Sequence, residues 1–401
     1  MTDIDRAIDE LIRQEVTRRR LLRNAGAGAL GVSAAAFLAA CGGGGIEGGS
    51  NKKESQVIPK GKIATTLNFS NWPLYIDVSG KRHPTLDEFQ KKYGTKVKYT
   101  EEINDNTEFF GKVRQQYAAG NSGGRDLQVV TDWMAAKMIQ LGYVQKLDKS
   151  AIPNVVNNMT DVLKNAPIDP KRDYTAPWQS GQTGLIYRKD KVGTPQSVND
   201  IFDPKLKGKV TMLTEMRDTV GLVMLGMGKD PQSFTNMDDA LAAIDKIDKA
   251  NKDGQIRRFT GNDYLKDLPK GDSWLVFGWS GDAVQLESDN KNIKFQQPDE
   301  GFMLWTDNMQ VPVGAPHAYT AEVYMNYVYD PEVQAKITAY VNYVPPVKGV
   351  QEIIKKDDPK LAESPLVFPD AQVLSRAKQF KNLTPDQENT LNTAFQKVIG
   401  A

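Results

Sequence analysis

Cysteine and histidine are almost absent from this chain of 401 residues. It contains one cysteine, Cys41, and two histidines, His83 and His317. One cysteine excludes a disulfide scaffold and a thiolate metal site, and two separated histidines are too few for a histidine zinc site. The sequence also lacks a G-x-S-x-G element and the glycine-rich loops that bind nucleotides. We therefore expect no catalytic residues, no metal and no cofactor.

The chain also lacks an excess of basic over acidic residues, since its formal net charge is only +1. The first 40 residues hold six arginines and five acidic residues, so the remainder carries 45 side chains of each sign. A balanced surface has no general attraction for nucleic acid or for anionic lipid. We expect no nucleic-acid partner.

The first 40 residues have the features of an export signal. Thr17-Arg18-Arg19-Arg20-Leu21-Leu22-Arg23 precedes a weakly apolar segment, residues 25–40, which is shorter than the roughly 20 residues of a membrane-spanning helix. This pattern resembles a twin-arginine signal, and Leu38-Ala39-Ala40-Cys41 resembles a lipobox. The resemblance implies that residues 1–40 are removed and that Cys41 is lipidated and holds the protein at the membrane. The alternative is an unprocessed N-terminal helix with a chance cysteine.

Residues 41–62 are rich in glycine, serine and lysine, a composition typical of a flexible tether. The folded body is then expected to begin near Ile63. A body of this length favours two domains over one.

Strand and helix patterns alternate along the body, which predicts an α/β fold. Helices are expected after His83 up to Gly94, and after a cap at Asn106-Thr107. The other expected elements are strands at 62–72, 96–103 and 127–133, and long helices at 237–251, 319–343 and 386–399. Polar and aromatic segments at 174–181 and 308–316 are the expected hinges between two lobes.

Tryptophans are few, but several are expected at the ends of strands, where ligands bind in open α/β sheets. Acidic residues lie beside them in the sequence. An indole face attracts an ammonium group, and carboxylates add charge-assisted hydrogen bonds, so this combination favours a pocket for an organic cation. The alternative is that each tryptophan only fills the core. The tryptophans are Trp72, Trp133, Trp279 and Trp305, and the acidic residues are Asp132, Asp282 and Asp307.

Residues 63–400 resemble the substrate-binding proteins of bacterial spermidine/putrescine ABC transporters. The resemblance rests on segments 71–75 (NWPLY), 126–150, 207–221, 277–283 (FGWSGDA), 300–308 (EGFMLWTDN) and 342–349 (NYVPPVKG). It implies a two-lobed periplasmic binding protein of type II, with a ligand cleft between lobe 1 (63–178 and 307–344) and lobe 2 (179–306 and 345–401). It also implies a monomeric, extracytoplasmic protein without enzymatic activity, which delivers a polyamine to a membrane permease.

The resemblance also assigns roles to individual residues. Trp72 and Tyr75 correspond to one aromatic wall, and Thr131 and Trp133 to contacts facing the other lobe. Glu215 and Asp218 correspond to a paired acidic site for one amine, and Asp307 to the aspartate that binds an internal amine. The remaining aromatic contacts are Trp279, Trp305 and Tyr343.

Two positions depart from this pattern, since Leu74 stands where spermidine binders have an acid and Trp133 where they have tyrosine. A third ammonium group near Leu74 would be unpaired, and an unpaired buried charge is costly. We therefore expect a diamine such as putrescine to bind better than spermidine. Three alternatives remain open: another cationic or zwitterionic solute in the same cleft, an extracytoplasmic enzyme, and a solvated helix start for Glu215, Arg217 and Asp218.

Overall fold

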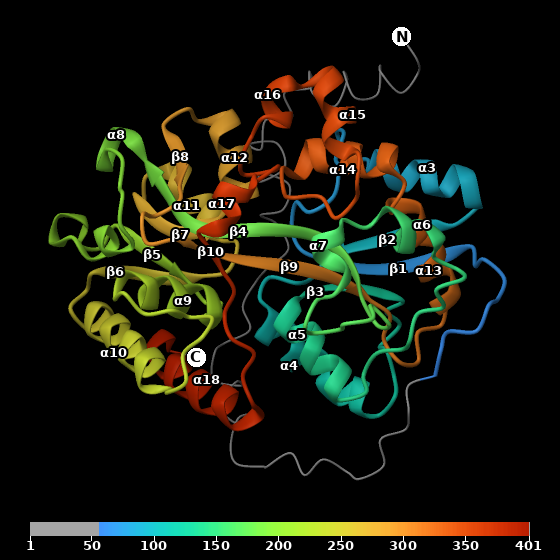
Figure 1. The fold of residues 1–401 in the computed structure, drawn as a ribbon, viewed down its shortest axis with the longest axis horizontal. Helices are drawn as coiled ribbons and strands as arrows, with labels where there is room; N and C mark the ends of the chain where they lie inside the picture. Colours follow the sequence, from blue (N-terminus) through green and yellow to red (C-terminus); the bar gives the residue numbers. More distant parts are fainter. Residues whose placement is uncertain (1–55, 401) are drawn as a thin grey trace.

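The computed structural model describes residues 56–400, and these form a single mixed sheet covered by helices (Figure 1). The expected signal peptide, Cys41 and most of the tether lie outside the described residues. The strands are β1 (Thr66–Asn71), β2 (Lys96–Glu101), β3 (Leu127–Thr131), β4 (Ala176–Arg188), β5 (Val210–Leu213), β6 (Ile256–Thr260), β7 (Leu275–Trp279), β8 (Ile293–Gln296), β9 (Phe302–Gln310) and β10 (Ala377–Lys378).

The helices alternate with these strands, so the α/β class predicted from the sequence is confirmed. They are α3 (Pro84–Tyr93), α4 (Asn106–Ala118), α5 (Asp132–Gln140), α6 (Pro153–Asn158), α7 (Asp161–Lys164), α8 (Lys189–Val192), η2 (Val198–Phe202), η3 (Pro204–Leu206), α9 (Met216–Gly226), α10 (Asp238–Lys252), α11 (Tyr264–Lys270), α12 (Ser280–Asp289), α13 (Ala318–Val328), α14 (Pro331–Val341), α15 (Val350–Asp357), α16 (Pro359–Ala362), α17 (Ala371–Ser375) and α18 (Pro385–Ile399). No helix in this described part is long and apolar enough to cross a membrane.

The sheet consists of two parallel groups joined by two long central strands. Its order is β2-β1-β3-β9-β4-β7-β5-β6. β1 is parallel to β2 and β3, and β5 is parallel to β6 and β7. β9 runs antiparallel to β3 and β4, and β4 runs antiparallel to β7. The central pair β4–β9 therefore lies between the two groups, as Figure 1 shows.

Burial of both sheet faces explains the apolar strand sequences. All residues of β5 and β7 are buried, as are the first four residues of β3. Parallel strands covered by helices on both faces read as continuous apolar runs rather than as an alternation. The core therefore extends through both parallel groups, and polar side chains collect where the strands end.

The expected long helix at 319–343 is wrong, because the structure has two helices there. α13 ends at Val328, and α14 starts at Pro331. Proline has no N–H for an intrahelical hydrogen bond and is favoured in the first helical turn. The Asp330 side chain accepts a hydrogen bond from the Glu332 N–H and so caps the second helix.

Two further boundaries differ from the expectation. The cap of α4 is Asp105, whose side chain accepts hydrogen bonds from the Thr107 and Glu108 N–H groups. The expected strand at 127–133 ends at Thr131, and residues 132–133 instead begin α5. Trp133 is therefore placed by a helix and not by a strand.

The tether boundary near residue 62 is too late. The Ile58 side chain is only 1% exposed, and its N–H donates to the Lys146 carbonyl at 2.9 Å. Val57 forms an isolated bridge with Lys146. Burial of the large apolar side chain of Ile58 fixes the chain to the body before Ile63.

Candidate ligand-binding site

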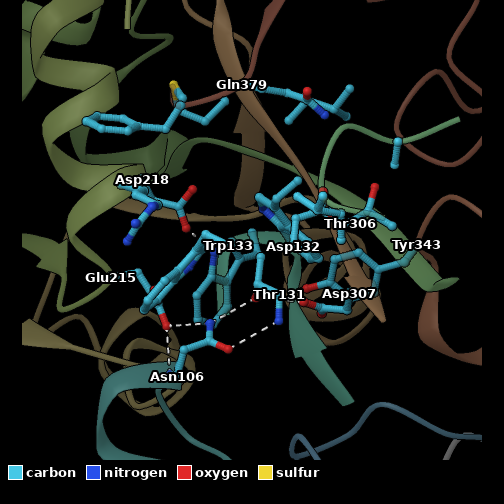
Figure 2. A pocket seen from close by; sticks show the side chains of 18 of the residues that line it. Asn106, Thr131, Asp132, Trp133, Glu215, Asp218, Thr306, Asp307, Tyr343 and Gln379 are labelled. Atoms are coloured by element: carbon cyan, nitrogen blue, oxygen red, sulfur yellow. Dashed lines mark hydrogen bonds between the residues drawn. The ribbon is translucent and has the colours of Figure 1, made fainter. Parts of the chain in front are cut away.

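A cavity of about 430 Å³ lies at the end of strands from both parallel groups and beside β9 (Figure 2). This volume is within the range of pockets that bind small organic molecules. All ten residues expected in a ligand site line it: Trp72, Tyr75, Thr131, Trp133, Glu215, Asp218, Trp279, Trp305, Asp307 and Tyr343. Residues separated by more than 200 positions in the sequence thus meet in one cavity.

Aromatic rings form a continuous wall in this cavity. Trp72 and Trp279 meet edge to face at 6.1 Å between ring centroids, and Trp279 and Trp305 at 6.4 Å. Tyr343 follows at 5.6 Å from Trp305, and Tyr75 at 5.2 Å from Tyr343. The Trp305–Tyr343 pair is tilted and the other three pairs are edge to face, and edge-to-face pairs are favourable geometries.

Glycines make room for two of these rings. Gly181 of β4 pairs with Trp305 of β9, and a Cβ atom at Gly181 would lie 2.3 Å from the Trp305 ring. A Cβ atom at Gly281 would lie 2.4 Å from the Tyr343 ring. Trp305 was expected near a strand end, but it lies inside β9, where only a glycine partner leaves space for its indole.

Asp218 orients the two central tryptophans. Its Oδ2 accepts a hydrogen bond from Trp279 Nε1 at 3.0 Å, and its Oδ1 accepts from Thr183 Oγ1 at 2.8 Å. Thr183 Oγ1 in turn accepts from Trp305 Nε1 at 2.9 Å. Burial raises the pKa of Asp218 to about 6, although these hydrogen bonds act in the opposite direction.

Glu215 connects the start of α9 to the start of α4. It occupies the N-cap position of α9, and its Oε1 accepts from both N and Nδ2 of Asn106 at 2.9 Å. These contacts are drawn in Figure 2. Burial, followed by the charge of Asp105, raises the pKa of Glu215 well above its usual range. Glu215 is only 6% exposed, and the partly buried Asp218 is hydrogen-bonded to Trp279 and Thr183, so the alternative of a solvated helix start is wrong.

Asp307 is the central carboxylate and is only 4% exposed. It lies opposite Thr131 in the β3–β9 ladder, and its Oδ1 accepts from Thr131 Oγ1 at 2.7 Å. Burial raises its pKa to about 7, and the charges of Asp132 and Asp218 contribute to the rise. Burial likewise raises the pKa of Asp132 to about 6.

The raised pKa values of the carboxyl groups in the cavity have a common physical cause. Buried carboxyl groups lose part of their hydration, so their ionised forms are favoured by a positive partner. No basic side chain in the described structure forms an ion pair with Asp307. A cationic ligand would supply the missing partner.

Asp282 supports the aromatic residues, although its position beside Trp279 in the sequence favours a contact with the cationic ligand. Its Oδ2 accepts hydrogen bonds from the Tyr264 hydroxyl at 2.7 Å and from Asn262 Nδ2 at 3.1 Å, and its Oδ1 accepts from the Tyr343 hydroxyl at 3.2 Å. These donors already occupy the carboxylate. Asp282 therefore holds the aromatic wall in place.

Leu74 does not line the cavity. Its N–H donates to Glu101 Oε1 at 3.0 Å, and its φ of 58° is unusual for leucine. Leu74 therefore does not leave the cavity short of a carboxylate, because the side chain at this position lies elsewhere.

The cavity also contains residues that the sequence did not reveal. The sequence predicts Asn106 only as a helix cap. The family resemblance implies a glutamine contact near residue 380 that the sequence alone does not place, and Gln379 lines the cavity. Basic residues share the cavity with the carboxylates. They are Arg172, Arg217 and Lys381, and the guanidinium of Arg217 lies on the ring of Trp133.

A family profile described as bacterial extracellular solute-binding protein matches residues 85–369. The chain belongs to this family. As a solute-binding protein it is a component of transport and not an enzyme, which confirms that expectation. The arrangement of two groups of parallel strands on either side of β4 and β9 is consistent with the two-lobed periplasmic binding fold.

Individual relatives of this solute-binding protein are described by what they bind. The putrescine-binding periplasmic protein of Escherichia coli is 29% identical over 352 residues, which cover 83% of this chain and 91% of that protein. A putrescine/agmatine-binding protein of Pseudomonas aeruginosa is 28% identical over 323 residues, covering 76% and 83%. A solved spermidine/putrescine ABC transporter protein of Listeria monocytogenes has a TM-score of 0.73 at 25% identity, covering 84% and 99%. The resemblance to polyamine-binding proteins drawn from the sequence is thus confirmed.

Proposed function

We propose that this solute-binding protein captures a polyamine outside the cytoplasm and delivers it to the permease of an ABC importer. The observation that supports the proposal is Asp307, a buried carboxylate that forms no ion pair with a basic side chain of residues 56–400 and lies beside a wall of aromatic rings. An alkylammonium chain matches both features, since its methylene groups pack on aromatic faces and its charges pair with carboxylates. The names of the relatives support the same ligand class.

We assign the ligand contacts to the ten residues that line the cavity and were expected from the sequence. Asp307 binds one ammonium group, Glu215 and Asp218 attract another, and the aromatic residues enclose the chain between them. Thr131 fixes the Asp307 carboxylate through its hydroxyl. The two lobes, 63–178 with 307–344 and 179–306 with 345–401, close on the ligand around β4 and β9.

We favour a diamine such as putrescine over spermidine. The carboxylates that line the cavity are Asp132, Glu215, Asp218, Asp282 and Asp307, and the basic residues are Arg172, Arg217 and Lys381. The basic side chains offset part of the negative charge of these carboxylates, which favours a ligand with two positive charges over one with three.

A zwitterionic solute is the second candidate. The observation in its favour is the buried pair Arg172 and Arg217, because arginine is the usual partner of a ligand carboxylate. An ω-amino acid would place its ammonium group near Asp307 and its carboxylate near one arginine.

We further propose that the protein is a monomeric lipoprotein held at the membrane through Cys41 after removal of residues 1–40. The twin-arginine and lipobox patterns support this. Cys41→Ala should leave unprocessed precursor or release the protein into the soluble fraction, because the lipid chains supply the membrane affinity. Lipid labelling and membrane fractionation test it; a membrane-bound, processed Cys41→Ala protein contradicts the anchor.

The experiment that tests the ligand class is a thermal-shift series on amine-free protein. Putrescine, spermidine, agmatine and 4-aminobutyrate are compared at equal concentrations, since a ligand that binds only the folded state raises its stability by mass action. The largest shift with putrescine supports the proposal. The largest shift with 4-aminobutyrate supports the zwitterion, and no shift with any of them contradicts both.

A further inference from the structure

Arg217 occupies a position where the ligand was expected. Its guanidinium carbon lies 3.9 Å from the centroid of the Trp133 ring, and the residue is only 9% exposed. A cation within about 6 Å of an aromatic centroid already uses the attraction of that ring face. This face of Trp133 is therefore taken by a side chain of the protein.

Glu388 of α18 fixes this arrangement from outside the cavity. Its Oε2 lies 3.5 Å from Arg217 Nη2, and its Oε1 lies 2.8 Å from Lys137 Nζ of α5. The Glu388 side chain is 15% exposed, so these charges are partly shielded from water. α18 itself packs on α10, where Asn251 Nδ2 donates to the Val398 carbonyl at 2.9 Å. The carboxylate that restrains Arg217 thus belongs to an anchored helix.

The charge of Arg217 reaches the acidic pair of the cavity. Its guanidinium interacts electrostatically with Glu388, Glu215 and Asp218, in this order of strength. Burial lowers the pKa of Arg217 to about 10, so the side chain remains charged at neutral pH. Glu215 and Asp218 therefore have a resident cation, whereas Asp307 has none.

We propose that Arg217, held on Trp133 by Glu388, is a specificity determinant that offsets part of the charge of Glu215 and Asp218, so that this end of the cavity holds one ammonium group but not two. The ligand class that remains is a short diamine, bound between Asp307 and Asp218 along the wall of Trp279 and Trp305. A longer triamine would have to bring its third ammonium group against the guanidinium. This inference rests on the proposed function and adds which residues limit the number of ligand charges.

The test compares the dissociation constants of spermidine and putrescine in variants of the full-length solute-binding protein. Arg217→Met removes the charge and keeps an apolar stem on Trp133. It should improve spermidine binding relative to putrescine by about tenfold, which corresponds to about 1.4 kcal/mol, because the third ammonium group no longer meets the guanidinium charge. Glu388→Gln removes the carboxylate that offsets the charge of Arg217 from outside the cavity, so it should change the ratio in the opposite direction, toward putrescine.

Lys137→Met is the matched control. It removes the other positive partner of Glu388 but leaves Arg217 in place, so the ratio should stay within about threefold of wild type. Thermal unfolding of each variant identifies loss of folding, and Glu388→Gln decides the question if Arg217→Met does not fold. An unchanged ratio in the folded variants overturns the inference, and so does a wild type that prefers spermidine. A wild type that binds neither amine contradicts the proposed function itself.

Discussion

Replacing Asp307 with asparagine tests the central contact of the cavity. The variant keeps the size of the side chain and an oxygen that accepts the Thr131 hydrogen bond, but it removes the charge. Taking one partner from a desolvated ion pair costs about 3–5 kcal/mol. Because about 1.4 kcal/mol corresponds to a tenfold change, putrescine should bind at least about a hundredfold more weakly.

The assay is isothermal titration calorimetry at pH 8. Burial raises the pKa of Asp307 to about 7, so the wild-type carboxyl is mostly ionised at pH 8 and the full effect of the charge is measured. Asp263→Asn is the control, because this half-exposed residue pairs with Lys266 outside the cavity and should leave affinity unchanged.

Stability of the free protein separates lost binding from lost folding. A carboxyl whose pKa is raised by folding contributes stability that is present below its unfolded pKa near 4, and this contribution is lost as the pH rises through 7. At pH 8 the ionised Asp307 therefore destabilises the free fold, and Asp307→Asn should unfold at the same or a higher temperature. A loss of affinity below tenfold in a folded variant would refute the assignment of Asp307 as the central contact.

Other perturbations address the pH dependence, the aromatic wall and closure. Burial raises the pKa values of Asp132, Asp218 and Asp307, so binding of a dication should release protons from them, and the affinity should fall between pH 8 and pH 5. Calorimetry in buffers of different ionisation enthalpy measures the proton release, and pH-independent binding would contradict this prediction. Trp305→Ala should weaken putrescine less than Asp307→Asn does, because a cation–π contact is worth about 0.5–2 kcal/mol; an equal or larger loss reverses the ranking. Gly181→Val should displace the Trp305 ring and reduce affinity with an unchanged far-ultraviolet circular dichroism spectrum; unchanged affinity would mean that the ring position is unimportant. Saturating putrescine should reduce the radius of gyration in small-angle scattering, and a constant radius excludes closure of the lobes.

The sequence predicts the class of fold well, because its signals are local. Gly94 ends α3 with a positive φ, as a glycine after a periodic segment predicts. The apolar run of β7, which ends with Trp279, is a buried parallel strand. The prediction of one long helix at 319–343 is wrong at Asp330-Pro331. The apolar periodicity continues on both sides of this pair and does not show that one helix ends and another begins there.

The cavity was predicted through its resemblance to a family rather than through local pattern. Spacing places Glu215 and Asp218 on one helical turn, but it cannot show that Asn106, 109 positions earlier, donates to Glu215. The same limit applies to Thr183, whose hydroxyl links Asp218 and Trp305 across β4 and β9. Such contacts depend on the sheet order, in which β9 inserts between β3 and β4, and strand order is not encoded in local periodicity.

The charged environment of Arg217 also could not be predicted from the sequence around it. In the sequence it stands between two acidic residues and is readily interpreted as a surface residue of a helix start. In the structure it is buried against Trp133 and Glu388, which lies 171 positions later. The contribution of a C-terminal helix to the cavity could not be derived from the residues around the site.

Calorimetric titration of amine-free protein with putrescine tests the account most directly. The cavity predicts one saturable site per chain, with a dissociation constant in the micromolar range or tighter, corresponding to about −8 kcal/mol or more favourable. It also predicts a negative heat-capacity change, because apolar surface of the aromatic wall is removed from water. Absence of saturable binding by putrescine, in protein that is folded and free of bound amine, would contradict the account.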